Sequence, residues 1–211
     1  MDFTGKVAVV TGASSGIGAA TAVLFATHGA RVSLIGRNEQ RLHATEAKCE
    51  AARGMQMLSI TADLLHEGSC ERVVNKTVET FGRIDVLVNC AGKAILTSLF
   101  EDSMEAYDEL FKLNLRVPYL LTQLALPYLV KTKGNIVNVI GAAMRTKPGF
   151  LPYAMARDGL ERFSKSGAVE LAAEGVQPEE IAKMIVFVAS DTCPNLNGTT
   201  LDVDGAASMA C

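Results

Sequence analysis

The stretch Thr11-Gly12-Ala13-Ser14-Ser15-Gly16-Ile17-Gly18 decides the fold, because it joins an apolar run to a stretch with helical periodicity. Gly12 permits a tight turn, Gly16 leaves room for a close ligand, and Gly18 lets the helix pack closely on the sheet. The N-terminus of such a helix presents free N–H groups that favour phosphate. A strand, a glycine loop and a helix in this order predict a dinucleotide-binding unit.

Apolar runs and helix-period stretches alternate along the rest of the chain. Strands are predicted at 6–11, 31–35, 55–60, 84–89, 135–140 and 200–203, and helices at 15–28, 38–53, 69–81, 102–130, 152–173 and 178–190. Apolar strands separated by helices form parallel sheets that are covered on both faces. The predicted fold class is therefore α/β: a single doubly wound parallel sheet, Rossmann-like, with helices on both faces. Residues 1–211 are expected to form one domain.

Single residues refine three of these helices. Ile17 and Phe25 lie on the predicted buried stripe of the first helix. Asn38 is suited to cap the second helix, and Asp102 with Glu105 forms a capping box at the start of the long fourth helix.

One strand is missing from the alternation. The helices at 152–173 and 178–190 are separated only by residues 174–177, whereas a parallel crossover returns through a strand. We therefore expect the sixth strand to be absent. We also expect the strand at 200–203 to pair with the fifth strand, because unpaired buried backbone groups are unfavourable.

Composition excludes several classes of protein. A net charge of −3 without a block of Lys or Arg argues against a nucleic-acid or membrane-surface protein, and 49% hydrophobic residues exclude disorder. The five cysteines include no C-x-x-C pair and predict reduced thiols. The three histidines are scattered, so no metal site is predicted. No targeting segment or membrane span is recognised, which predicts a cytoplasmic protein.

The G-x-x-x-G-x-G spacing of the loop resembles that of the short-chain dehydrogenase/reductase family, and other motifs extend the resemblance over nearly the whole chain. They are Asp63 after the third strand, Asn89-Cys90-Ala91-Gly92, Asn114 in the context Lys-Leu-Asn-Leu, Tyr153 after Pro148-Gly149, and Val203-Asp204-Gly205. The resemblance implies that the cofactor contacts Gly12, Ser14, Ser15, Gly16, Ile17, Gly18, Asp63, Asn89, Ala91 and Gly92.

Charge at the end of the second strand indicates which cofactor is preferred. Arg37 and Asn38 stand where NAD-dependent relatives carry an acidic residue for the ribose hydroxyls. A guanidinium suits a 2′-phosphate. We therefore expect NADP(H) to be preferred over NAD(H), with Arg37 and Asn38 in contact with the cofactor.

The resemblance also implies the catalytic residues. Tyr153 would exchange a proton with the substrate, Asn114 would support a water relay, and Arg157 occupies the position of the family's lysine. Arg157 keeps the positive charge but does not copy the reach of an ammonium. Ile140 and Gly141 stand where the family has Ser-Ser, so the serine that orients the carbonyl is missing. The segment that forms the substrate lid is expected to be absent as well.

These features imply an NADP(H)-dependent oxidoreductase that reduces a carbonyl or oxidises a secondary alcohol, with impaired turnover. Two alternatives stay open: a cofactor-binding or partner-binding pseudoenzyme, and a splice or gene-model product of an active reductase. Relatives pair through the long helix and the tyrosine helix, so a homodimer or homotetramer is expected. The other expected partner is a small carbonyl or alcohol substrate, with no nucleic acid and no membrane.

Overall fold

One parallel sheet organises the molecule. The computed structural model describes residues 2–53, 56–97, 99–100, 104–140 and 147–172. Within them, five strands lie in the order β3-β2-β1-β4-β5 and pair in parallel throughout. The strands are β1 (Val7–Thr11), β2 (Arg31–Gly36), β3 (Leu58–Thr61), β4 (Val86–Asn89) and β5 (Asn135–Asn138). The strand order reverses between β1 and β4, which is where ligands bind in open α/β sheets.

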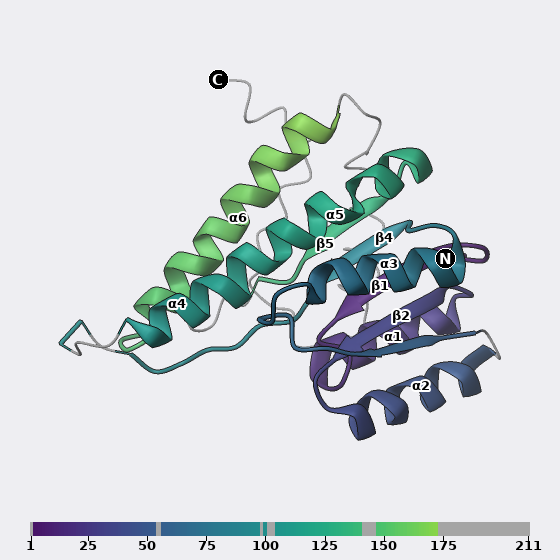
Figure 1. Ribbon diagram of the computed structural model, residues 1–211, viewed down its shortest axis with the longest axis horizontal. Coiled ribbons are helices and arrows are strands. Elements are labelled where there is room, and N and C mark those ends of the chain that lie inside the picture. Colours follow the sequence, from purple (N-terminus) through teal and green to yellow (C-terminus); the bar gives the residue numbers. More distant parts are fainter. Residues whose placement is uncertain (1, 54–55, 98, 101–103, 141–146, 173–211) are drawn as a thin grey trace.

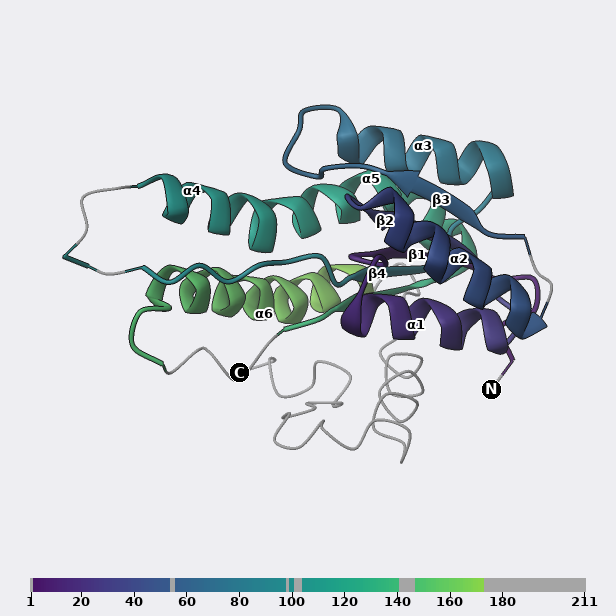
Figure 2. The ribbon, with the colours of Figure 1, turned by 90° about the horizontal axis from the view of Figure 1, so that it is seen from below.

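Helices cover both faces of this sheet (Figures 1 and 2). They are α1 (Gly16–Thr27), α2 (Glu39–Arg53), α3 (Ser69–Phe81), α4 (Glu105–Phe111), a π-helical stretch η1 (Lys112–Arg116), α5 (Val117–Thr132) and α6 (Leu151–Ala172). The α1 and α2 helices pack against one face, and α3 and α5 pack against the other. The α6 helix runs beside α4, η1 and β5. The predicted doubly wound α/β fold is confirmed.

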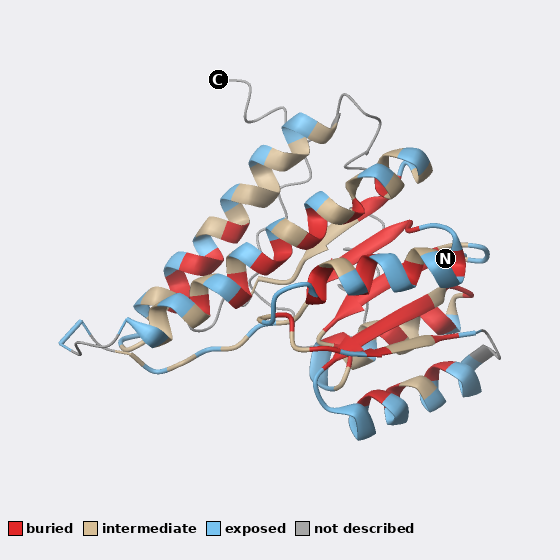
Figure 3. Ribbon diagram, viewed as in Figure 1, coloured by how far each residue is buried: buried red, intermediate tan, exposed pale blue. Residues whose placement is uncertain are grey.

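The two hydrophobic cores lie on opposite faces of the sheet, because successive side chains of a strand point to opposite sides. In β1, Ala8 and Val10 pack on the side of Phe25 in α1, whereas Val9 packs on the side of Leu121 in α5. The central strands are buried along their whole length (Figure 3). Burial on both faces explains why these strands read as continuous apolar runs.

The predicted elements occur within the described residues with several differences in their bounds. The fourth strand starts at Val86 rather than Ile84, and the fifth ends at Asn138 rather than Ile140. The single long helix predicted at 102–130 is divided into α4, η1 and α5. The third strand starts later than predicted, at Leu58 rather than Met55. The predicted buried stripe of α1 is wrong at Ile17, which is 60% exposed, although Phe25 is buried as expected. Besides Phe25, the buried residues of α1 are all small and let the helix lie close to the sheet; they are Gly18, Ala22 and Ala26.

The first residues of α2 and α4 show whether the predicted helix caps are present. Asn38 caps α2 as predicted, since its Oδ1 accepts a hydrogen bond of 2.9 Å from the N–H of Arg41. The α4 helix starts at Glu105 after Met104, which makes no side-chain cap bond, while Asp102 lies outside the described residues. The elements predicted at 178–190 and 200–203, the pairing of the last strand with β5, and the absent sixth strand and lid also fall outside the described residues.

Candidate active site

The glycine loop and the segment after β4 meet where the strand order reverses. Thr11, the last residue of β1, fastens them: its Oγ1 accepts the N–H groups of Cys90 and Ala91 at 2.9 and 3.0 Å. The same hydroxyl donates to the carbonyl of Val88 at 3.2 Å. A Cβ on Gly12 would lie only 3.1 Å from the backbone of Ala91. Sequence reasoning missed Thr11, whose signal was a polar residue ending an apolar strand.

The loop itself has the shape of a phosphate cradle. Gly12 and Gly16 have φ values of +71° and +53°, which disfavour residues with a side chain. A Cβ on Gly18 would overlap the carbonyl of Gly12, so α1 can start this close only with glycine there. A Cβ on Gly16 would meet no protein atom, which leaves that side open. Ser15 makes no side-chain cap bond to the first turn of α1, whose N–H groups stay available for an anion.

The ends of β2 and β3 form the neighbouring part of this edge. Gly36 and Thr61 are paired across the two strands, so Arg37 and Asp63 follow at the same edge. Arg37 and Asn38 are exposed. The Oδ1 of Asp63 accepts the N–H of Leu65 at 3.0 Å. The Oδ1 of Asn38 is occupied by the α2 cap, so only the amide N–H groups of this side chain can bind a ligand.

Gly36 also lies next to the glycine loop. A Cβ there would come within 2.9 Å of the side chain of Ser14. The predicted cofactor residues therefore line one continuous edge, from Asp63 through the glycine loop to Gly92. An extended dinucleotide fits this edge, because its phosphates would meet N–H groups at the centre and its two ends would lie over flanking strands.

Tyr153 and Arg157 are one turn apart near the start of α6 and are both buried, at 7% and 6% exposure. The guanidinium carbon of Arg157 lies 5.4 Å from the centre of the Tyr153 ring. Its Nη1 donates to the carbonyl of Val139 at 3.2 Å, and its buried Nε has no hydrogen-bond partner. A Cβ on Gly92 would overlap this guanidinium, so the structure brings Arg157 directly against the Asn89–Gly92 segment.

Asn114 is fully buried in η1. Its Nδ2 donates to the carbonyl of Lys93 at 2.9 Å, and its Oδ1 accepts the N–H of Lys93 at 3.2 Å. The π-helical turn is marked by the bond from the N–H of Val117 to the carbonyl of Lys112. Pro118 lacks the N–H that would bond the carbonyl of Asn114 in an α-helix, which favours this irregular turn. Asn114 thus holds the segment after Gly92 in place.

Asn89 is the last residue of β4 and is buried. Its Nδ2 donates to Oδ1 of Asn138 at 2.9 Å, while its own Oδ1 is buried without a hydrogen-bond partner. Ile140 occupies one of the two positions where the resemblance leads us to expect serine. It is partly buried, and its side chain has no hydrogen-bond donor. Gly141 lies outside the described residues.

The three cysteines that the structure describes are Cys49 and Cys70, which are buried, and Cys90, which is partly buried. Burial raises the pKa of Cys90, although the charge of Arg157 partly opposes this shift. Burial also raises the pKa of Cys49 and of Cys70 to about 11. Because the thiolate is the reactive form, a raised pKa disfavours nucleophilic reactivity at these three cysteines. In the described part of the chain, no cluster of three metal-ligating side chains occurs. Every helix described there is too short or too polar to cross a membrane.

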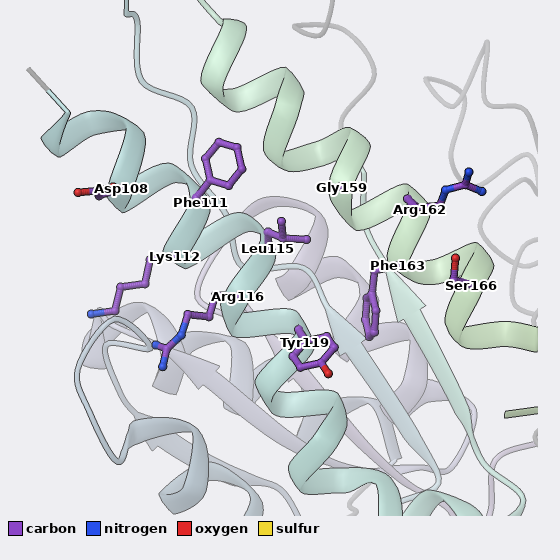
Figure 4. A pocket seen from close by; sticks show the side chains of 10 residues that line it. All are labelled: Asp108, Phe111, Lys112, Leu115, Arg116, Tyr119, Gly159, Arg162, Phe163 and Ser166. Carbon is purple, nitrogen blue, oxygen red and sulfur yellow. The ribbon is translucent and has the colours of Figure 1, made fainter. Parts of the chain in front are cut away.

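A separate groove of about 770 Å³ runs between α6 and the α4–η1–α5 segment (Figure 4). Its apolar lining includes Phe111, Leu115, Tyr119 and Phe163. The rings of Tyr119 and Phe163 are 5.2 Å apart across it. This groove is distinct from the edge that carries the glycine loop.

Comparison with protein families and sequences gives a consistent result. A family model described as short chain dehydrogenase matches residues 6–192. A 3-oxoacyl-acyl-carrier-protein reductase of Thermotoga maritima is 30% identical over 243 residues, with 97% of this chain and 98% of that protein covered. A reductase of the same description from Synechocystis is 34% identical, with 92% and 79% covered. The first alignment is longer than the 211 residues of this chain, so that relative has residues without a counterpart here.

Solved structures are similar as well. A short-chain dehydrogenase/reductase of unknown function from Caenorhabditis elegans, solved with cofactor, has a TM-score of 0.77 at 37% identity. The match covers 82% of this chain and 67% of that one. A metagenomic short-chain oxidoreductase in complex with NADP has a TM-score of 0.77 at 35% identity, with 82% and 79% covered.

Proposed function

Because the chain belongs to the short-chain dehydrogenase family, whose members are oxidoreductases that bind a nicotinamide cofactor, we propose that it binds NADP(H) and interconverts a carbonyl and a secondary alcohol at a low rate. The observation that carries the cofactor proposal is the glycine cradle fastened to Ala91 where the strand order reverses. The similar metagenomic oxidoreductase was solved with NADP, whereas a xylitol dehydrogenase at 25% identity was solved with NAD+. Arg37 supports the choice of NADP(H), because it offers an exposed cation at the end of β2.

Each part of the cofactor has residues suited to hold it. The phosphates would lie on the glycine loop, at Gly12, Ser14, Ser15, Gly16, Ile17 and Gly18. A 2′-phosphate would meet Arg37 and the amide N–H groups of Asn38, and the adenine would lie by Asp63. The nicotinamide half would extend past Asn89, Ala91 and Gly92 toward Arg157. The bound nicotinamide would supply or accept the hydride.

The remaining chemistry belongs to this chain's own side chains. Tyr153 would give a proton to the substrate oxygen or take one from it. The guanidinium carbon of Arg157 lies 5.4 Å from the centre of the Tyr153 ring, so a cation adjoins the side chain that would exchange the proton. Asn114 fixes the segment after Gly92 and so shapes the wall next to Arg157.

Two features support impaired turnover. Neither Ile140 nor Gly141 carries a side-chain donor for the substrate carbonyl. Arg157 already donates to Val139, and a guanidinium does not pass protons as an ammonium can. The longer alignment with the Thermotoga maritima reductase supports the further proposal that a strand and its crossover are absent after Val176. The same features favour the alternative that the chain binds the cofactor without turning it over.

We also propose that two copies associate through the groove between α6 and the α4–η1–α5 segment. The groove exposes aromatic and aliphatic side chains to solvent, including Tyr119 at 47% exposure. A large apolar surface of this kind favours association. The proposed assembly is a homodimer, or a homotetramer if a second face also pairs.

Calorimetric titration of the chain with NADPH and NADH tests the cofactor proposal. We expect NADPH to bind more tightly, and Arg37→Ala to remove most of the difference. Lys76→Ala removes a cation from the exposed side of α3 and should leave both affinities unchanged. Equal affinities in the unmodified chain would contradict the NADP(H) preference, and binding of neither cofactor would contradict the proposed function itself.

A further inference from the structure

Three polar side chains cross from the sheet to α6 in a continuous chain of hydrogen bonds. Asn89 of β4 donates from Nδ2 to Oδ1 of Asn138 in β5 at 2.9 Å. Asn138 donates from Nδ2 to Oγ of Ser164 at 2.8 Å. Ser164 donates its own hydroxyl to the carbonyl of Leu160 at 2.8 Å, one turn back along α6. Every bond has a defined donor and acceptor, so the chain has one direction.

This chain of bonds acts on the same helix as Arg157 and at the same end of β5. Ser164 and Arg157 are two turns apart, so they lie on the same side of α6. Asn138 and Val139 are consecutive, and the carbonyl of Val139 accepts Nη1 of Arg157 at 3.2 Å. The helix is therefore attached to the end of β5 at two points. Loss of either one would let α6 shift along the strand.

From this arrangement we infer that Ser164, acting through Asn138, is a positioning residue for the nicotinamide half of the cofactor site. It fixes the position of α6 and so determines where Arg157 lies against Gly92. Without it, the hydrogen bond from Arg157 to Val139 has to hold the helix alone. The inference rests on the proposed function, because it assumes that the cofactor runs from the glycine loop to Arg157.

Two ligands distinguish a positioning role of Ser164 from a general loss of structure. NADPH would span the whole edge, whereas 2′,5′-ADP would reach only the part formed by the glycine loop, Arg37 and Asp63. We expect Ser164→Ala to weaken NADPH binding about tenfold and to change 2′,5′-ADP binding by less than about twofold. Ser164→Thr keeps the hydroxyl and should restore NADPH affinity. Thr80→Ala, which removes a hydroxyl from an exposed position on α3, should affect neither ligand.

A double-mutant cycle tests whether Ser164 acts through Asn138. Asn138→Ala should weaken NADPH binding as Ser164→Ala does, and the double variant should be no weaker than either single one. If Ser164→Ala does not fold, Ser164→Cys, with a weak acceptor in place of the hydroxyl, serves for the same comparison. Equal loss of both ligands, or loss of neither, would overturn the role of Ser164. Failure of the unmodified chain to bind NADPH or NADH would instead overturn the proposed function and this inference with it.

Discussion

Arg157 donates a hydrogen bond from Nη1 to the main-chain oxygen of Val139 at 3.2 Å, so a cation on α6 is attached to the end of β5. The same guanidinium lies over the ring of Tyr153 and against the backbone of Gly92. One buried side chain therefore joins a helix, a strand and the segment after β4. Its replacement should affect the stability of the fold as well as the site.

Arg157→Ala is expected to lower the free energy of unfolding by about 2–4 kcal/mol, because it leaves a cavity and an unpaired carbonyl on Val139. Urea denaturation with an unchanged slope measures this loss. Arg41→Ala removes an exposed guanidinium from α2 and should change stability by less than about 0.5 kcal/mol. A comparable loss in the two variants would show that Arg157 is not a structural attachment.

Two glycines, Gly92 against Arg157 and Gly167 further along α6, allow a second comparison. Gly92→Ala should destabilise the protein by about 1–3 kcal/mol, since the new methyl group would overlap Arg157 and lie 2.7 Å from Oδ1 of Asn114. Gly167→Ala should instead stabilise it by about 0.5–1 kcal/mol, because a Cβ inside α6 would meet only the Phe163 ring at 3.8 Å. Thermal unfolding of the two variants measures both effects, and a shift of the same sign in both would contradict the packing described for Gly92.

Much of the fold follows from local sequence, but the connections within the site do not. Periodicity predicted α3 at Ser69–Phe81, because its apolar residues recur every three or four positions. Periodicity failed at Ile17, where small residues rather than large ones face the sheet. The bonds from Arg157 to Val139 and from Asn138 to Ser164 join residues far apart in the chain. No local pattern encodes such pairs, since they depend on where α6 lies along β5.

Gly159 illustrates the same limit. Sequence reasoning assigns it a helix penalty of roughly 1 kcal/mol relative to alanine. In the structure, a Cβ there would lie 2.9 Å from Cδ2 of Leu115. The missing side chain lets α6 approach η1 closely, so tertiary packing gives this glycine a role that helix propensity alone does not predict.

A single substitution that introduces a charge into the groove tests whether two copies associate there. Phe163→Asp places a carboxylate beside Tyr119 and should convert the proposed dimer into monomers, because burying an unpaired charge is unfavourable. Size-exclusion chromatography with light scattering measures the mass of the assembly in solution. Val169→Asp adds the same charge at a half-exposed position outside the groove and should leave the mass unchanged. A monomeric unmodified chain would refute this assembly.

The buried thiols predict a specific loss of stability in alkali. The pKa of Cys49 and of Cys70 is raised from 9.0 to about 11 by burial, so below pH 9 folded and unfolded chains are both protonated at these sites. Between pH 9 and about 11 the unfolded chain loses these protons first, and stability falls as the pH rises. The variant Cys49→Ala with Cys70→Ala should show a smaller fall in melting temperature over this range. An identical fall in both proteins would contradict the assignment.

Catalysis provides the last test, because Tyr153 and Arg157 are present while a side-chain donor at positions 140 and 141 is not. Loss of one well-placed donor commonly lowers a rate by about 10²–10³, so we expect NADPH oxidation at least about a hundredfold slower than in an intact relative with a shared carbonyl substrate. Gly141→Ser combined with Arg157→Lys restores the donor and the ammonium and should raise the rate. The matched variant Tyr153→Phe removes the proposed proton donor and should abolish whatever rate remains. A fast rate in the unmodified chain that Tyr153→Phe abolishes would show that Arg157 suffices. No rate in the restored variant would instead place the main defect in the segment that we propose to be absent after Val176, since no side-chain repair near Tyr153 can replace a wall of the substrate pocket.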